Sequence, residues 1–96
     1  MKFTLTQAAK RDLVDIGIKT QEKWGKRKRV SYLKDIDSAF SLLARFPNMG
    51  TSCDHYREGY RKHPCGSHVI FYTQENDGSI LIIRVLHSAM LPESYL

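Results

Sequence analysis

Hydrophobic side chains recur at spacings of three and four residues through the first half of the chain. The alternating segment 2–6 predicts a short strand, and the periodic segment that follows predicts a helix from Thr6, whose hydroxyl can cap it, to Gly25. A second periodic segment ends at Pro47, because the residue before a proline resists helical backbone angles. These segments predict a helical hairpin. The residues expected to pack between the helices and a sheet are Leu13, Ile16, Trp24, Leu33, Phe40 and Leu43.

The second half of the chain alternates with the two-residue period of β-strands. A loop rich in turn formers at 47–55 is followed by three predicted strands, at 56–63, 67–75 and 79–87. Asp77 and Gly78 favour a tight hairpin turn before the last strand. The order strand, helix, helix, strand, strand, strand predicts an α+β fold with an antiparallel sheet, the helical hairpin on one face and the other face open. Alternation along the last strand places on one face Ile80, Ile82, Arg84 and Leu86.

Size and composition narrow the class of protein. A chain of 96 residues with 42% hydrophobic and 26% charged residues is typical of one globular domain. The longest apolar run, Ile80–Ile83, is far too short to span a membrane, and the N-terminus turns polar too early for a signal peptide. We therefore expect a cytoplasmic protein without a membrane partner. Its net charge of +5 favours an acidic partner, either nucleic acid or protein.

Arg84 interrupts an otherwise apolar strand, where a charge is costly unless it is paired or open to water. Two interpretations stay open. Arg57, Arg61 and Arg84 converge on the open sheet face into a basic patch for an anionic target. Alternatively, Arg84 pairs with a carboxylate such as Glu58 or Glu75.

His87 ends the same strand and is a candidate acid/base group. Cleavage of RNA needs a base, an acid and cations near the phosphorane, and Arg61, Arg84 and His87 supply parts of that alternative catalytic set. No carboxylate is clearly placed as the base, and a strand-end histidine satisfied by hydrogen bonds is commoner. We therefore predict no catalytic residues but a target-binding surface made by Arg57, Arg61, Arg84 and His87.

Two further groups of residues have ordinary explanations. Cys53, His55, His63 and Cys65 are four possible zinc ligands, but their spacing differs from that of common zinc fingers, so we favour two free thiols and no cofactor. The run KRKR at 26–29 opens the second helix, where cations oppose the helix dipole. A solvated helix start explains it, and an attraction to DNA or RNA is the alternative.

Five segments together resemble the ParE toxins of bacterial ParD–ParE toxin–antitoxin systems, within the RelE/ParE superfamily. They are LTQAAKRDLVDI at 5–16, WGKRKRVSYL at 24–33, LLARFPNMGTSCD at 42–54, REGYRKHPCGSHVIFY at 57–72 and IIRVLHSAM at 82–90. The resemblance covers nearly the whole chain, and its fold is the one expected above. It implies a toxin that binds DNA gyrase, traps it on cleaved DNA and blocks replication. It also implies a ParD-like antitoxin whose flexible acidic segment wraps the toxin, docking on the helical hairpin and an exposed strand edge, in a hetero-oligomer.

Two alternatives accompany the resemblance. RelE-like members of the superfamily cleave mRNA on the ribosome, and Arg61, Arg84 and His87 match such a set, but Ser88 stands where some of these ribonucleases have tyrosine. ParE-like chains often carry an aspartate after the methionine of the SAML segment, where this chain has Leu91. That departure leaves room for a non-toxic module that keeps only antitoxin binding.

Overall fold

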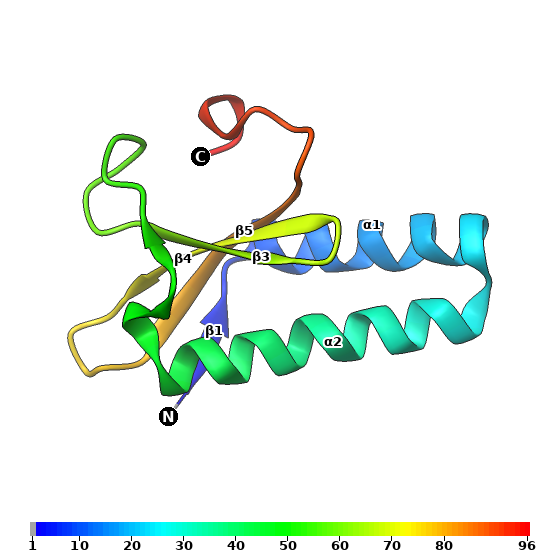
Figure 1. The fold of residues 1–96 in the computed structure, drawn as a ribbon, viewed down its shortest axis with the longest axis horizontal. Helices are drawn as coiled ribbons and strands as arrows, with labels where there is room; N and C mark the ends of the chain where they lie inside the picture. The colour runs from blue at the N-terminus through cyan, green and yellow to red at the C-terminus, as the bar shows by residue number, and fades with distance from the viewer. Residues whose placement is uncertain (1) are drawn as a thin grey trace.

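Two helices pack across one face of a five-stranded sheet (Figure 1). The computed structural model describes residues 2–96. Two short 3-10 helices, at Pro47–Met49 and Pro92–Ser94, follow α2 and β5. The helices and strands are β1 (Phe3–Leu5), α1 (Gln7–Trp24), α2 (Lys26–Arg45), β2 (Thr51–Ser52), β3 (Arg61–Cys65), β4 (His68–Gln74) and β5 (Ile80–His87).

The helix ends follow the local chemistry of the sequence. Thr6 caps α1 by accepting a hydrogen bond from the Ala9 amide at 3.0 Å. Gly25 separates the helices with φ of +92°, a backbone conformation that side-chain-bearing residues rarely adopt. α2 ends one residue before Phe46, and Pro47 follows. The predicted helical hairpin is therefore confirmed, with both boundaries in their expected places.

The strand order in the sheet is β1-β5-β4-β3-β2. The pairs β2–β3, β3–β4 and β4–β5 are antiparallel. β1 pairs parallel with β5, and Phe3 lies opposite Ile80. The α+β fold class is confirmed, but the sheet is mixed rather than purely antiparallel, and it has a fifth strand, β2, within the segment that was predicted to be a loop. Both helices and three strands separate β1 from β5 in the chain, so no tight turn fixes their relative direction.

The segment before β3 differs from the prediction of a strand at 56–63. Residues 53–60 form successive turns instead, closed by the Cys53 amide donating to the Tyr60 carbonyl at 2.8 Å. The Gly59 amide donates to the Asp54 carboxylate at 2.8 Å, and Gly59 has φ of +86°. These local bonds satisfy the backbone, so only the last part of the predicted segment joins the sheet.

The main core lies between the helices and the sheet. Ile16, Phe40 and Leu43 are buried there, and Leu13 and Leu33 pack at its margin, as predicted. Trp24 was expected in this core, but 66% of its surface is exposed, so that prediction is wrong. It stands at the end of α1, where the helical hairpin extends past the sheet (Figure 1).

A second apolar cluster covers the face of the sheet that was expected to be open. Cys53, Phe71 and Leu86 are almost fully buried, under side chains of the 53–60 loop and the C-terminal tail. The prediction of a bare, positively charged face is therefore wrong. The partly buried residues that cover the cluster or pack beside it are Tyr56, Tyr60, Val69, Met90 and Leu96. Within residues 2–96, no helix combines the length and the apolar character needed to cross a membrane.

Candidate functional site

A β-bulge in β5 decides where Arg84 lies. Phe71 of β4 pairs with Arg84, but the next residue, Tyr72, pairs with Ile82, so Ile83 is an extra residue in the ladder. The bulge reverses the alternation of side chains beyond it. Ile82 belongs to the helix-side core, whereas Arg84 lies beside Phe71 of the opposite cluster. The prediction that Ile82 and Arg84 share a face is therefore wrong.

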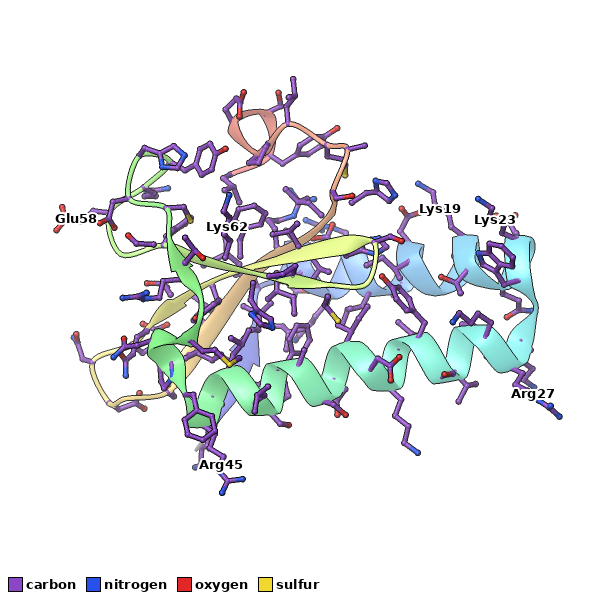
Figure 2. The ribbon with its side chains drawn as sticks, viewed as in Figure 1. Lys19, Lys23, Arg27, Arg45, Glu58 and Lys62 are labelled. Atoms are coloured by element: carbon purple, nitrogen blue, oxygen red, sulfur yellow. The ribbon has the colours of Figure 1, made fainter. Side chains whose placement is uncertain are left out.

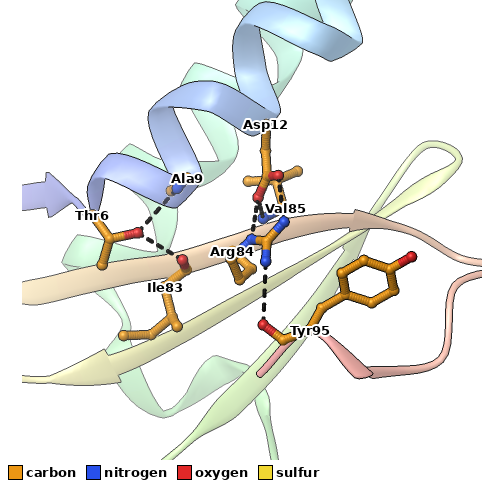
Figure 3. A network of polar contacts seen from close by, with 7 residues as sticks. All are labelled: Thr6, Ala9, Asp12, Ile83, Arg84, Val85 and Tyr95. Carbon is orange, nitrogen blue, oxygen red and sulfur yellow. Dashed lines mark hydrogen bonds and ion pairs between the residues drawn. The ribbon is translucent and has the colours of Figure 1, made fainter. Parts of the chain in front are cut away.

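Arg84 makes a two-pronged ion pair with Asp12 of α1 (Figure 3). Its Nε and Nη2 atoms donate to the two carboxylate oxygens, each at 2.8 Å, and its Nη1 donates to the Tyr95 carbonyl at 3.2 Å. The Val85 amide donates to the same carboxylate at 2.9 Å. The hydrogen bond with Asp12 raises the pKa of Arg84. The alternative that Arg84 is paired is thus correct, but its partner is Asp12 rather than Glu58 or Glu75.

This network also closes the edge of β5 beyond the short strand β1. The Thr6 hydroxyl donates to the Ile83 carbonyl at 2.7 Å, and Asp12 accepts from the Val85 amide. The start of α1 therefore supplies side-chain partners for strand atoms that β1 does not reach. Arg84 lies between this helix and the tail, where its guanidinium is 5.6 Å from the Tyr95 ring centroid.

Arg61 belongs to a different network, on the helix side of the sheet. Its Nη1 donates to the Gly50 carbonyl at 2.7 Å. Tyr72, opposite Arg61 in the ladder, accepts from the Gly50 amide at 2.9 Å and donates to the Pro47 carbonyl at 2.7 Å. Burial raises the pKa of Tyr72. Arg61 and Tyr72 thus hold the segment between α2 and β2.

The predicted convergence of arginines does not occur. Arg61 lies opposite Tyr72 of the helix-side core, whereas Arg84 lies opposite Phe71 of the second cluster. Arg57 is exposed in the turns before β3. The cation that shares a cross-strand row with Phe71 and Arg84 is Lys62, which the sequence interpretation did not single out.

His87 is exposed at the end of β5, and it lies against a second histidine. The His68 and His87 rings are edge to face with centroids 5.4 Å apart, and these residues are opposite each other in the ladder. The Ala89 amide donates to His87 Nδ1 at 3.1 Å, so the prediction of a strand-end histidine in a hydrogen bond is confirmed. His68 Nδ1 lies 2.7 Å from the Tyr32 hydroxyl. Burial, and then the proximity of His87, lowers the pKa of His68.

The four possible zinc ligands do not form a site. Cys53 belongs to the apolar cluster on one face of the sheet, whereas Cys65 packs against the core on the other face. Across residues 2–96, no three histidine, cysteine or acidic side chains are grouped as a metal site requires. Both cysteines are free, and burial raises the pKa of each thiol.

The outer surface of the helical hairpin exposes aliphatic side chains. Val14, Ile18 and Val30 are 64%, 53% and 54% exposed. They line a groove of about 440 Å³ between α1 and α2, together with Gly17 and Arg29. Neighbouring exposed apolar residues on two elements are typical of a surface that binds another protein.

Known proteins resemble this chain over nearly its whole length. A family model described as the ParE toxin of the type II toxin–antitoxin system parDE matches residues 3–92. The chain belongs to the ParE toxin family. Two curated relatives of this ParE toxin, both named Toxin ParE1, come from Mycobacterium tuberculosis and Caulobacter vibrioides. The first is 37% identical over 93% of this chain and 91% of its own length. The second is 34% identical over 98% of this chain and 96% of its own length.

A solved structure has the same fold as this ParE toxin. It is described as the chromosomal ParDE TA system from P. aeruginosa, and its matching chain is 20% identical with a TM-score of 0.77. The match covers 91% of this chain and 95% of that chain. At this identity the likeness shows the shared fold.

Three residues that organise the surface of this ParE toxin were missed from the sequence. Asp12, Tyr32 and His68 were not assigned to any predicted site. The spacing of an aspartate on the first helix and an arginine on the last strand carries no signal of their contact. A tyrosine that follows a run of basic residues likewise gives no sign that it will contact a histidine 36 positions later. Only the packing of α1 and α2 on the sheet brings these side chains to their partners.

Proposed function

We propose that this ParE toxin blocks replication by binding DNA gyrase and trapping it on cleaved DNA, rather than by catalysing a reaction of its own. The observation that carries the proposal is the family match across residues 3–92, together with relatives that align over nearly their whole length. Such a target requires the toxin to act in the cytoplasm. A ParD-type antitoxin would neutralise it in a hetero-oligomeric complex.

The geometry of the arginines favours binding over ribonuclease chemistry. Cleavage of RNA needs cations gathered around one phosphorane. Arg61 is bonded to the Gly50 carbonyl, and Arg84 is paired with Asp12 at another place on the sheet. The alternative set of Arg61, Arg84 and His87 is therefore not assembled around one substrate position.

The exposed members of the predicted surface are the better candidates for contact with gyrase. Arg57 and His87 are exposed, whereas Arg61 and Arg84 are engaged within the chain. We propose that Arg57 and His87 touch the target and that the other two hold the loop and the tail that shape this surface. Replacing Arg57 with alanine should reduce toxicity without lowering the stability of the fold.

Two assays run side by side test the toxic activity. Toxin refolded after separation from its antitoxin is added to a gyrase supercoiling reaction and to a translation reaction. We expect loss of supercoiling with accumulation of cleaved DNA, and unchanged translation. The reverse pattern would support a RelE-like ribonuclease. Inactivity in both reactions would support the non-toxic module that Leu91 leaves open, and either result would overturn the gyrase proposal.

The groove on the helical hairpin is our proposed dock for the antitoxin. Val14, Ile18 and Val30 offer an apolar stripe, and Arg29, which also lines the groove, suits an acidic segment that becomes ordered on binding. The sheet edge is less suitable, because β3 is already paired with β2 at Arg61 and Lys62, and Pro64 lacks an amide donor.

A pair of matched variants tests this dock. Ile18→Lys places a charge in the groove, whereas Leu42→Lys makes the same change at an exposed aliphatic residue of α2 outside the residues that line it. We expect Ile18→Lys to weaken binding of the ParD-type antitoxin by at least about tenfold, measured by calorimetry, because a lysine is desolvated there. Equal affinities of the two variants would place the antitoxin elsewhere.

A further inference from the structure

A second hollow lies between the end of the helical hairpin and the turn that joins β3 to β4. Its volume is about 430 Å³, and its walls come from both helices, the turn, the start of β4 and the end of β5. The lining contains five side chains that carry or can accept a positive charge, and no carboxylate of the described residues lines it. The residues used below are Lys19, Lys23, Lys28, Trp24, His68 and His87.

One wall of this hollow is fixed by Tyr32. Its hydroxyl accepts from the Ser67 amide at 3.0 Å and lies 3.2 Å from the Cys65 carbonyl. Gly66 allows this approach, since a β-carbon there would meet the tyrosine ring at 2.6 Å and its φ is +58°. The turn is therefore held against α2, and the hollow does not depend on a mobile loop.

His68 and His87 both line the hollow, and each ring has a contact at its Nδ1 atom. Nδ1 of His68 lies beside the Tyr32 hydroxyl, and Nδ1 of His87 accepts a hydrogen bond from the Ala89 amide. These two contacts orient the rings. Burial and the adjacent His87 lower the pKa of His68, because two imidazolium charges repel at this distance. An anion bound beside the two rings would offset that repulsion.

The lysines continue a larger concentration of positive charge. Residues 19–29 hold six lysines and arginines and one carboxylate, Glu22. Lys19 and Lys23 project from α1 on one side of the hairpin, whereas Arg27 projects from its end (Figure 2). Lys19 also pairs with Asp15 at 3.0 Å, but both side chains are mostly exposed, so this pair is weak and can open.

Trp24 supplies an aromatic face beside these cations. Its ring is 66% exposed, and it is the single tryptophan of the chain. An exposed indole bordered by lysines is the arrangement on which single-stranded nucleic acid stacks its bases while its phosphates meet the cations. An acidic peptide would use the charges, but it has no planar bases to match the ring.

We propose that this hollow and the adjoining hairpin end bind single-stranded nucleic acid, with phosphates at Lys23 and Lys28 and a base stacked on Trp24. The inference stands on the geometry of the hollow and not on gyrase as the target. It predicts that the toxin binds single-stranded nucleic acid wherever it encounters it.

A labelled oligothymidylate of about twelve nucleotides tests the proposal, since sites on single strands commonly span about 4–16 nucleotides. Anisotropy reports binding, and fluorescence of the single tryptophan reports stacking. We expect saturable binding at low salt with quenching of Trp24. Trp24→Leu should weaken the affinity about tenfold, because stacking on an aromatic ring contributes that order of effect.

Charge-matched double variants separate the hollow from net charge. Lys23→Gln with Lys28→Gln removes two lining cations, and Lys10→Gln with Lys34→Gln removes two exposed cations outside this hollow. We expect at least about a tenfold loss of affinity in the first and less than about threefold in the second. The slope of log K against log salt should fall by about 1.4 only in the first, at about 0.7 for each phosphate contact.

Three kinds of result would overturn the proposal. The first is binding without quenching of Trp24, or no binding at low salt. The second is equal weakening by both double variants, which would indicate a response to net charge alone. The third is displacement of the oligonucleotide by polyglutamate of equal charge with the same quenching, which would make the hollow a site for an acidic peptide. Circular dichroism of all variants checks that the fold is retained, as expected for exposed lysines.

Discussion

Replacing Asp12 with alanine should strongly destabilise this toxin. The Asp12 carboxylate accepts two hydrogen bonds from Arg84 and one from the Val85 amide, and the two charged side chains are 13% and 21% exposed. Removing one partner of a buried ion pair costs about 3–5 kcal/mol, because the remaining charge stays desolvated. The residual exposure of Arg84 and its bond to Tyr95 reduce this, so we expect about 2–4 kcal/mol.

This loss is a large share of the total stability. A chain of 96 residues is expected to have a free energy of unfolding of about 5–14 kcal/mol, at roughly 0.05–0.15 kcal/mol per residue. The variant should therefore still fold at 25 °C, with a Tm lower by roughly 10–30 °C. Urea unfolding followed by circular dichroism measures the change. Fluorescence is less suitable, because Trp24 is largely exposed in the folded chain.

Asp15→Ala on the same helix is the matched control. Asp15 also pairs with a cation, Lys19, at 3.0 Å, but these side chains are 60% and 73% exposed. An exposed pair of this kind contributes at most about 1 kcal/mol, and the gain in helix propensity from alanine is the same in both variants. If Asp12→Ala costs no more than Asp15→Ala, the assignment of Arg84 as a structural residue is refuted.

Three further outcomes test other contacts. Gly66→Ala should lower the free energy of unfolding by about 2–4 kcal/mol, because φ is positive there and the new β-carbon would collide with Tyr32. Gly78→Ala also has a positive φ but open space around the β-carbon, so it should cost about 1 kcal/mol. Equal costs would contradict the Tyr32 contact. Tyr72→Phe should cost about 1.5–3 kcal/mol in urea unfolding, because its hydroxyl bonds two loop backbone groups; a loss below about 0.5 kcal/mol would contradict this. The pKa of His68 is lowered in the folded chain, so the unfolded chain binds the proton more readily. The contribution of His68 to the free energy of unfolding is therefore fully present above about pH 6.5 and is lost as the pH falls toward the pKa of the folded chain. His68→Gln should flatten that fall, and an unchanged pH profile would contradict it.

Local chemistry in the sequence determined the helices and the turn between β4 and β5, whereas the family was indicated by resemblance across five segments. Thr6, Gly25 and Pro47 act on their immediate neighbours, so the ends of both helices are readable without knowledge of the fold. Gly78 likewise marks the turn between β4 and β5. The strand at 56–63 was only partly correct, because side-chain bonds within the 53–60 turns competed with sheet pairing.

The candidate site depended on contacts between residues far apart in the chain. Asp12 and Arg84 are 72 positions apart, and Tyr32 and His68 are 36 positions apart. One extra residue in the β5 ladder, Ile83, moved every side chain after it to the other face, and no local pattern announces such a bulge.

Sequence alone therefore determined both helices and the strands β1, β4 and β5, because capping, turn formation and periodicity act over a few residues, and the five quoted segments indicated the family by resemblance. The tertiary structure alone decided the parallel pairing of β1, the covering of the second sheet face and the partner of Arg84. Each of these is selected by the packing of segments that become neighbours only when the whole chain folds, since burial of apolar area and pairing of buried charge are properties of the assembled structure.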